Sequence, residues 1–179
     1  MLLDINDYKP TFRGLEIPVI IQKLLKLQNE VEFEYFSNGF ELQALDNPYL
    51  RTGTENPECF KAAIEFAEAS ASGDVYAFWL RNGNTDLNNA PILRFCGDQA
   101  WGDVVAENLV GLVQLLSIDS ENYERDEDYT ESGNHQGLLK LMREELHIEP
   151  ITDRHLILKP AEEKYQKDFM AWFTTYITL

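Results

Sequence analysis

VYAFWLRNGNTDLNNAPILRFCGDQAWGDVVAENLVGLVQLL, residues 75–116, is the stretch that decides the fold. It contains three apolar runs, VYAFWL (75–80), ILRFC (92–96) and VVA (104–106), which are separated by Asn-, Gly- and Asp-containing turns. Short runs rich in β-branched and aromatic residues between such turns predict three consecutive antiparallel strands. Because VYAFWL is apolar throughout, we expect it to be a central strand with both faces covered.

A helix is predicted directly after these strands. Asn108 is a plausible N-cap, and Leu109, Leu112, Val113 and Leu116 follow at positions i, i+3, i+4 and i+7. This spacing places the four side chains on one helical face, so the helix should lie on the sheet.

The segments before this core predict further elements. Apolar spacing predicts a helix over about 16–28, and alternation around Ser37-Asn38-Gly39 predicts a β-hairpin over 31–42. Residues 45–54 contain Asn-Pro and Gly and indicate a loop. Phe60, Ala63, Ile64 and Ala67 recur at helical spacing, which predicts a helix that ends near Gly73.

Two more helices are predicted after the core. One contains Leu138 to Leu146 and is bounded by Pro150. The other opens at Pro160, and its side chains Tyr165, Phe169, Trp172, Phe173 and Tyr176 form an aromatic stripe that we expect to be core. The elements together predict an α+β fold: a single domain over 1–179, with a mostly antiparallel sheet of about five strands packed by about five helices.

The charge of the chain restricts its partners. Fifteen Lys and Arg oppose 31 Asp and Glu among 179 residues, which gives a net charge of −16. This charge disfavours binding to nucleic acid or to an anionic membrane surface. Because no apolar run approaches the roughly 20 residues that span a bilayer and the N-terminus lacks signal-peptide features, we expect a cytoplasmic protein.

Residues 119–134, DSENYERDEDYTESGN, carry seven acidic groups and one arginine with hardly any aliphatic side chain. We expect a solvated acidic loop that contributes nothing to the core. Its carboxylates serve either solubility or the docking of a basic partner. The candidate partner-binding residues are Asp119, Glu121, Glu124, Asp126, Glu127, Asp128 and Glu131.

Signatures of catalysis and metal binding are absent from the sequence. No nucleophile elbow, Walker loop, dinucleotide fingerprint, His-Glu-x-x-His or EF-hand spacing is present, and we expect no cofactor, no metal and no catalytic residue. Cys59 and Cys96 are expected to be small buried thiols. A hydrolase remains an alternative if the fold gathers at least two of five side chains in one pocket. Otherwise we expect the three histidines to be exposed at helix ends and the two aspartates to lie at turns and strand ends. The five side chains are His135, His147, His155, Asp98 and Asp103.

The strands VYAFWL and PILRFCGD, followed by VVAENLVGLVQLL, resemble the SUKH superfamily, the Smi/Knr-like group of mostly bacterial immunity proteins. The resemblance covers about 55–176 and includes Ile148-Glu149-Pro150 and the closing helix. The residues placed on the family's core motif are Gly97, Asp98, Trp101, Val104, Val105, Ala106, Asn108 and Leu109. The chain departs from the family pattern after Gly-Asp, where Gln99, Ala100 and Trp101 stand in place of an acidic residue and glycines.

The resemblance implies an α+β fold and a function without catalysis. Many members are thought to be immunity proteins that bind a secreted polymorphic toxin, often a nuclease, and occlude its active surface. A cognate basic toxin domain is therefore the expected partner, while the state of self-association stays open. The alternatives are a regulatory or scaffold module of the same fold with an endogenous protein partner, and a small hydrolase whose site is assembled only in the fold.

Overall fold

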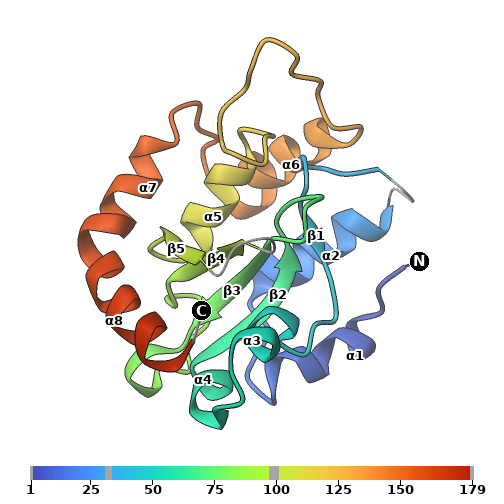
Figure 1. Ribbon diagram of the computed structural model, residues 1–179. Helices are drawn as coiled ribbons and strands as arrows, with labels where there is room; N and C mark the ends of the chain where they lie inside the picture. Colours follow the sequence, from blue (N-terminus) through green and yellow to red (C-terminus); the bar gives the residue numbers. More distant parts are fainter. Residues whose placement is uncertain (1, 31–33, 97–100, 178–179) are drawn as a thin grey trace.

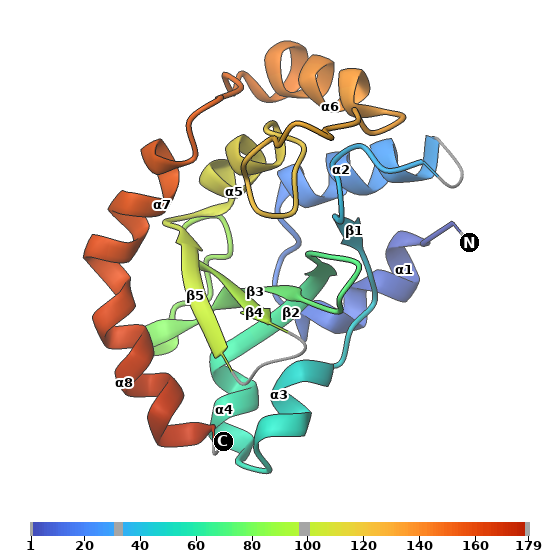
Figure 2. The same ribbon diagram turned by 45° about the horizontal axis from the view of Figure 1, so that its top comes forward.

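The computed structural model describes residues 2–30, 34–96 and 101–177, and its centre is an antiparallel sheet with helices on both faces (Figures 1 and 2). Five strands lie in the order β1-β2-β3-β4-β5, so each strand pairs with its neighbours in sequence. Their bounds are β1 Glu41–Leu42, β2 Ala63–Glu68, β3 Val75–Trp79, β4 Ile92–Cys96 and β5 Trp101–Ala106. The predicted α+β fold class is confirmed.

Strand β3 is central, as its apolar sequence predicts. It pairs with β2 on one side and β4 on the other, and all five of its residues are buried. Tyr76 and Phe78 belong to one apolar cluster, whereas Val75, Ala77 and Trp79 belong to a second. Alternate side chains of a strand point to opposite faces, so the sheet has a core on each side.

The helical segments around the sheet vary from one to three turns. They are α1 Ile5–Tyr8, η1 Lys9–Phe12, α2 Val19–Glu30, α3 Pro48–Gly53, α4 Pro57–Ala62, η2 Arg81–Gly83, α5 Leu109–Leu116, α6 His135–Leu141, η3 Met142–Leu146, α7 His155–Ala161, η4 Glu162–Gln166 and α8 Lys167–Tyr176. Both η3 and η4 are π-helical turns that continue α6 and α7.

The predicted helix after the core is confirmed as α5. The side chain of Asn108 accepts a hydrogen bond from the backbone N–H of Gly111 (3.1 Å), which satisfies one of the free donors at the helix start. Helix α5 packs on the same face of the sheet as α2 and α6, where Leu24, Leu112 and Leu138 are fully buried. This face carries the larger core.

The opposite face is covered by α8 and by the short helices α3 and α4. Helices α7, η4 and α8 form one continuous helical stretch along the sheet (Figure 1). Phe169 and Phe173 are buried against Phe95 of β4, and Trp172 contacts Trp79. Phe169 and Phe173 are therefore core, as predicted. The other three aromatic side chains of the stripe are partly buried and pack against this core: Tyr165, Trp172 and Tyr176. The start of this helix differs from the prediction, because α7 begins at His155 and Pro160 lies inside it.

The helix predicted over 60–67 is wrong. The short helix α4 ends at Ala62, and the chain continues as β2, an inner strand between β1 and β3. Five of its six residues are buried, so apolar side chains occur on both faces and mimic helical spacing. The expected loop over 45–54 is also partly wrong, because Pro48–Gly53 form α3.

The predicted hairpin is described only in part. Residues 31–33, which the prediction assigns to its first strand, lie outside the described part of the chain. The turn around Ser37-Asn38-Gly39 does form, and Gly39 has a positive φ of 73°. The strand after the turn, β1, pairs with β2, which lies more than 20 residues further along the chain.

Candidate protein-interaction surface

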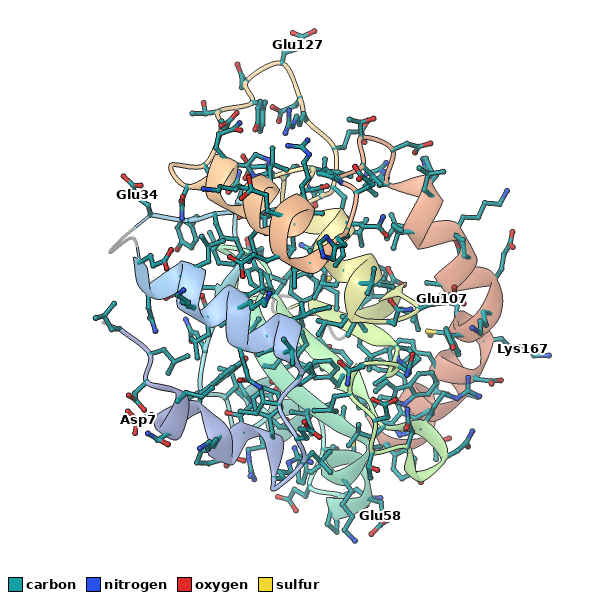
Figure 3. All side chains as sticks on the ribbon, turned by 180° about the vertical axis from the view of Figure 1, so that it is seen from behind. Asp7, Glu34, Glu58, Glu107, Glu127 and Lys167 are labelled. Carbon is teal, nitrogen blue, oxygen red and sulfur yellow. The ribbon has the colours of Figure 1, made fainter. Side chains whose placement is uncertain are left out.

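The acidic loop, residues 119–134, joins α5 to α6 and projects beyond the helices (Figure 1). Glu127 lies at its outermost point, as Figure 3 shows from behind. The base of the loop is held by three sets of polar contacts, whereas its outer part is exposed. The loop therefore has an anchored base and a charged tip.

Asp119 is the first anchor, and its position corrects the prediction that it contributes to an exposed rim. It is fully buried and has a positive φ of 59°. Its Oδ1 accepts hydrogen bonds from the Asn38 N–H (2.8 Å) and the Ser132 hydroxyl (2.6 Å). Its Oδ2 accepts from the Ser132 N–H (2.8 Å) and the Tyr129 hydroxyl (2.9 Å). Asp119 thus closes the loop upon itself and fastens it to the turn before β1.

Tyr123 is the second anchor, and it corrects the expectation that the loop contributes nothing to the core. Its ring is buried, and its hydroxyl lies 2.7 Å from that of Tyr76 on β3. Burial raises the pKa of Tyr123, so the hydroxyl stays protonated and can take part in this hydrogen bond. The Arg94 guanidinium lies over the Tyr123 ring and donates to Asp74 and to the Glu121 carbonyl oxygen.

The third anchor is a pair of arginines at the base of the loop. Arg125 donates from Nε to the Ile118 carbonyl oxygen (2.7 Å) and lies over the Tyr129 ring. Arg154, at the start of α7, forms an ion pair with Glu124 at 2.9 Å. Contacts from β3, β4 and α7 therefore hold the loop from several directions.

Six of the seven predicted rim residues remain accessible, but they differ in their partners. Glu121 is half-buried and accepts from the Ala71 N–H (3.1 Å), and Glu124 is paired with Arg154. The others are exposed and form no ion pair within the described residues: Asp126, Glu127, Asp128 and Glu131. These four carboxylates form the acidic tip.

The acidic tip is ordered by local hydrogen bonds. The backbone N–H of Asp128 donates to Oδ1 of Asp126 (3.1 Å), and the Gln136 side chain donates to Glu131 (2.9 Å). A set of unpaired carboxylates on an anchored loop attracts ammonium and guanidinium groups, and it loses little conformational entropy on binding them. The tip is therefore suited to contact with a basic surface.

The residues of the hydrolase alternative come from separate elements. His135 is buried at the start of α6, where its Nδ1 lies 3.0 Å from the Phe36 carbonyl oxygen, which corrects the expectation of an exposed histidine. His147 and His155 are exposed. Asp103 on β5 is half-buried and accepts from Gln166 (3.0 Å), and burial raises its pKa. Asp98 lies outside the described residues.

Neither cysteine forms a disulfide, and no metal cluster is found where the chain is described. Cys59 is buried and Cys96 half-buried, and both are free; burial raises the pKa of the Cys59 thiol to about 11. Within residues 2–30, 34–96 and 101–177, no group of three or more His, Cys, Asp or Glu side chains is arranged to hold a metal ion.

Most of the residues that the resemblance places on the family motif have structural roles in β5 and α5. Val104, Val105 and Ala106 are buried in β5, Asn108 caps α5 and Leu109 is buried behind it. Trp101 begins β5 and is 45% exposed. Gly97 and Asp98 lie outside the described residues.

Comparison with protein-family models, curated proteins and solved structures finds no match to this chain. Among the helices that the structure describes, none is long and apolar enough to cross a membrane.

Proposed function

We propose that this chain is a non-catalytic, cytoplasmic protein-binding domain of SUKH type. In this proposal it is an immunity protein that neutralises a polymorphic toxin by covering the toxin's basic active surface. The observation that carries the proposal is the acidic tip, whose four carboxylates lack ion-pair partners among the described residues although the base of their loop is anchored. The SUKH resemblance supplies the class of partner.

Electrostatics supports this partner class. A toxin that cleaves nucleic acid needs a cationic surface to hold phosphates, and a chain with a net charge of −16 is attracted to that surface. Protein interfaces of ordinary size bury about 1,600 Å² in total, which is more than the acidic tip alone provides. The tip therefore acts as part of the charged rim and accelerates association.

The experiment measures the association of this chain with a purified basic toxin domain, identified from an adjacent gene or by affinity capture with the tagged chain. Association is followed by stopped-flow fluorescence. The test variant combines Asp126→Asn with Glu127→Lys and Asp128→Lys. Asparagine at 126 keeps an acceptor for the Asp128 N–H, so the local turn is preserved. We expect the association rate constant to fall about tenfold or more at low salt, and the effect to shrink as salt screens the charges.

A control variant changes the net charge by the same amount away from the loop. It combines Glu16→Gln with Glu55→Lys and Glu149→Lys, three exposed carboxylates without an ion pair in the described residues. An equal loss in both variants would assign the effect to net charge and remove the tip from the interface. Absence of binding to the toxin domain, together with no protection on co-expression, would reject the immunity function and favour a regulatory module.

A further inference from the structure

A cavity of about 600 Å³ lies between the base of the acidic loop, the α6–η3 helix and the segment that leads into α7. These three parts lie side by side in Figure 2. Its apolar wall includes Ile118, Leu139 and Ile151, and its polar wall includes Arg125, Arg143 and Arg154. Concave pockets of this volume that combine an apolar wall with polar groups are common sites for small ligands.

The concentration of arginine in this cavity is unusual for so acidic a chain. Three of the seven arginines in the sequence line it, and none of the eight lysines does. Guanidinium groups bind phosphate and carboxylate groups through two parallel hydrogen bonds, which an ammonium group cannot form. The composition of the wall therefore favours an oxyanion.

Two of these arginines have donors that remain available. Arg143 forms no hydrogen bond or ion pair with any described residue, and its side chain is exposed at the cavity. Arg125 donates only from Nε, to the Ile118 carbonyl oxygen, so both of its terminal nitrogens are unoccupied within the described chain. Arg154 differs, because Glu124 and the Asn122 carbonyl oxygen already engage it.

The carboxylates of the cavity do not neutralise these donors. Glu124 is paired with Arg154 at 2.9 Å. Asp153 accepts a hydrogen bond from the backbone N–H of His155 (2.9 Å) and forms no ion pair with Arg125 or Arg143. Three arginines against two acidic groups give the Arg, Asp and Glu side chains of the lining an excess of one positive charge.

We propose that this cavity binds a small organic oxyanion, a phosphate or carboxylate group attached to an apolar body. Arg143 and Arg125 hold the oxyanion, and the wall formed by Ile118, Leu139 and Ile151 receives the apolar body. The site is separate from the acidic tip and does not depend on the proposed function. A ligand there would contact Tyr123, Glu124 and Arg125, which belong to the base of the acidic loop.

The test is isothermal titration of the full chain in a buffer free of phosphate and carboxylate. Phenyl phosphate and benzoate probe the two oxyanions on an apolar body. Inorganic phosphate and acetate probe the oxyanions without that body, and phenol probes the apolar body alone. We expect saturable binding of phenyl phosphate or benzoate, with the corresponding fragments at least about tenfold weaker. Methyl NMR signals of Ile118, Leu139 and Ile151 should shift during the same titration.

Arg143→Gln is the test variant, and Lys140→Gln is its matched control. Both residues are exposed, lie on the α6–η3 helix and lose one positive charge, but only Arg143 lines the cavity. We expect Arg143→Gln to weaken phenyl phosphate or benzoate binding by about tenfold or more, and Lys140→Gln to leave it within about twofold. Equal affinities in the wild type and Arg143→Gln, no saturable binding, or methyl shifts confined to other residues would each overturn the proposal.

Discussion

Glu65 is the buried residue of this chain with the clearest consequence for stability. It lies in β2, is fully buried, and its carboxylate accepts the N–H groups of Tyr49 (3.0 Å) and Leu50 (2.9 Å) at the start of α3. Burial raises its pKa from 4.5 to about 7, although these two bonds and the nearby Arg13 and Arg51 act in the opposite direction.

The raised pKa predicts that Glu65 makes stability decrease with increasing pH. The folded state holds the proton more tightly than the unfolded state, so the contribution is complete below about pH 4.5 and is lost as the pH rises through about 7. The shift corresponds to about 3 kcal/mol. The measurement is urea unfolding of the wild type and Glu65→Gln across this range. The free energy of unfolding of the wild type minus that of Glu65→Gln should fall by about 3 kcal/mol as the pH rises through this range.

Glu68→Gln is a suitable control, because it removes a carboxylate from the half-buried end of the same strand. The free energy of unfolding of the wild type minus that of Glu68→Gln, plotted against pH, reports the effect of losing one negative charge from this part of the sheet. A wild-type minus Glu65→Gln difference that stays constant with pH would contradict the prediction.

At the residue scale, the sequence predicts that residues 119–134 form an acidic loop, but it does not predict which of them anchor the loop. Asp119 and Glu127 belong to one acidic run, yet one is fully buried and the other exposed at the tip. The difference arises from contacts with Asn38, 81 positions away, and from a hydroxyl and an N–H of Ser132. The cost of burying an isolated carboxylate is offset by such distant donors, and no local pattern reveals them.

At the element scale, the packing of α8 on β5 depends on Gly102. This residue pairs with Phe95 of β4, and a Cβ placed on it would lie 2.8 Å from Phe95 Cδ1 and 3.2 Å from Phe169 Cζ. Both rings are fully buried. The absence of a side chain at 102 lets the two rings approach the β5 backbone.

Gly102→Ala should therefore destabilise the protein by about 2 kcal/mol through overpacking. The measurement is urea unfolding of Gly102→Ala, Phe95→Leu and the double variant. Because leucine is smaller than phenylalanine, the Phe95→Leu change leaves room for the new methyl group. The double variant should therefore lose less stability than the two single losses added together. An unchanged stability of Gly102→Ala would show that the rings tolerate a Cβ. Strictly additive losses would show that the cost does not come from the Phe95 ring, and would assign it to the other close atoms, among them the backbone oxygen of Arg94 at 3.1 Å.

Elements are predictable from the sequence where local signals agree with the fold. Strands β3 and β4 and helix α5 are expected because apolar runs, turn residues and the Asn108 cap all indicate the same structure. Strand β2 resembles a helix in sequence because its interior position buries both faces, which removes the alternation that identifies a strand. Pro160 suggests a helix start, whereas α7 begins five residues earlier.

At the scale of the whole molecule, the two apolar cores on either side of the sheet stabilise the fold, whereas repulsion between its negative charges destabilises it. The chain carries a net charge of −16 at pH 7, and its sequence pI is about 4.4. Most of the ion pairs are exposed at the surface, such as Lys26–Glu30 and Lys140–Glu144, and pairs of this kind contribute little. Repulsion between carboxylates should therefore outweigh attraction in the folded state.

This balance predicts that salt stabilises the protein at neutral pH. Raising NaCl from about 20 mM to about 500 mM shortens the Debye length several-fold and should increase the free energy of unfolding by about 1 kcal/mol at pH 7.5. Urea is the appropriate denaturant because it adds no ions. Near pH 4.4 the net charge approaches zero, so the same addition of salt should have a much smaller effect. A loss of stability with salt at pH 7.5 would mean that ion pairs, rather than repulsion, dominate the surface.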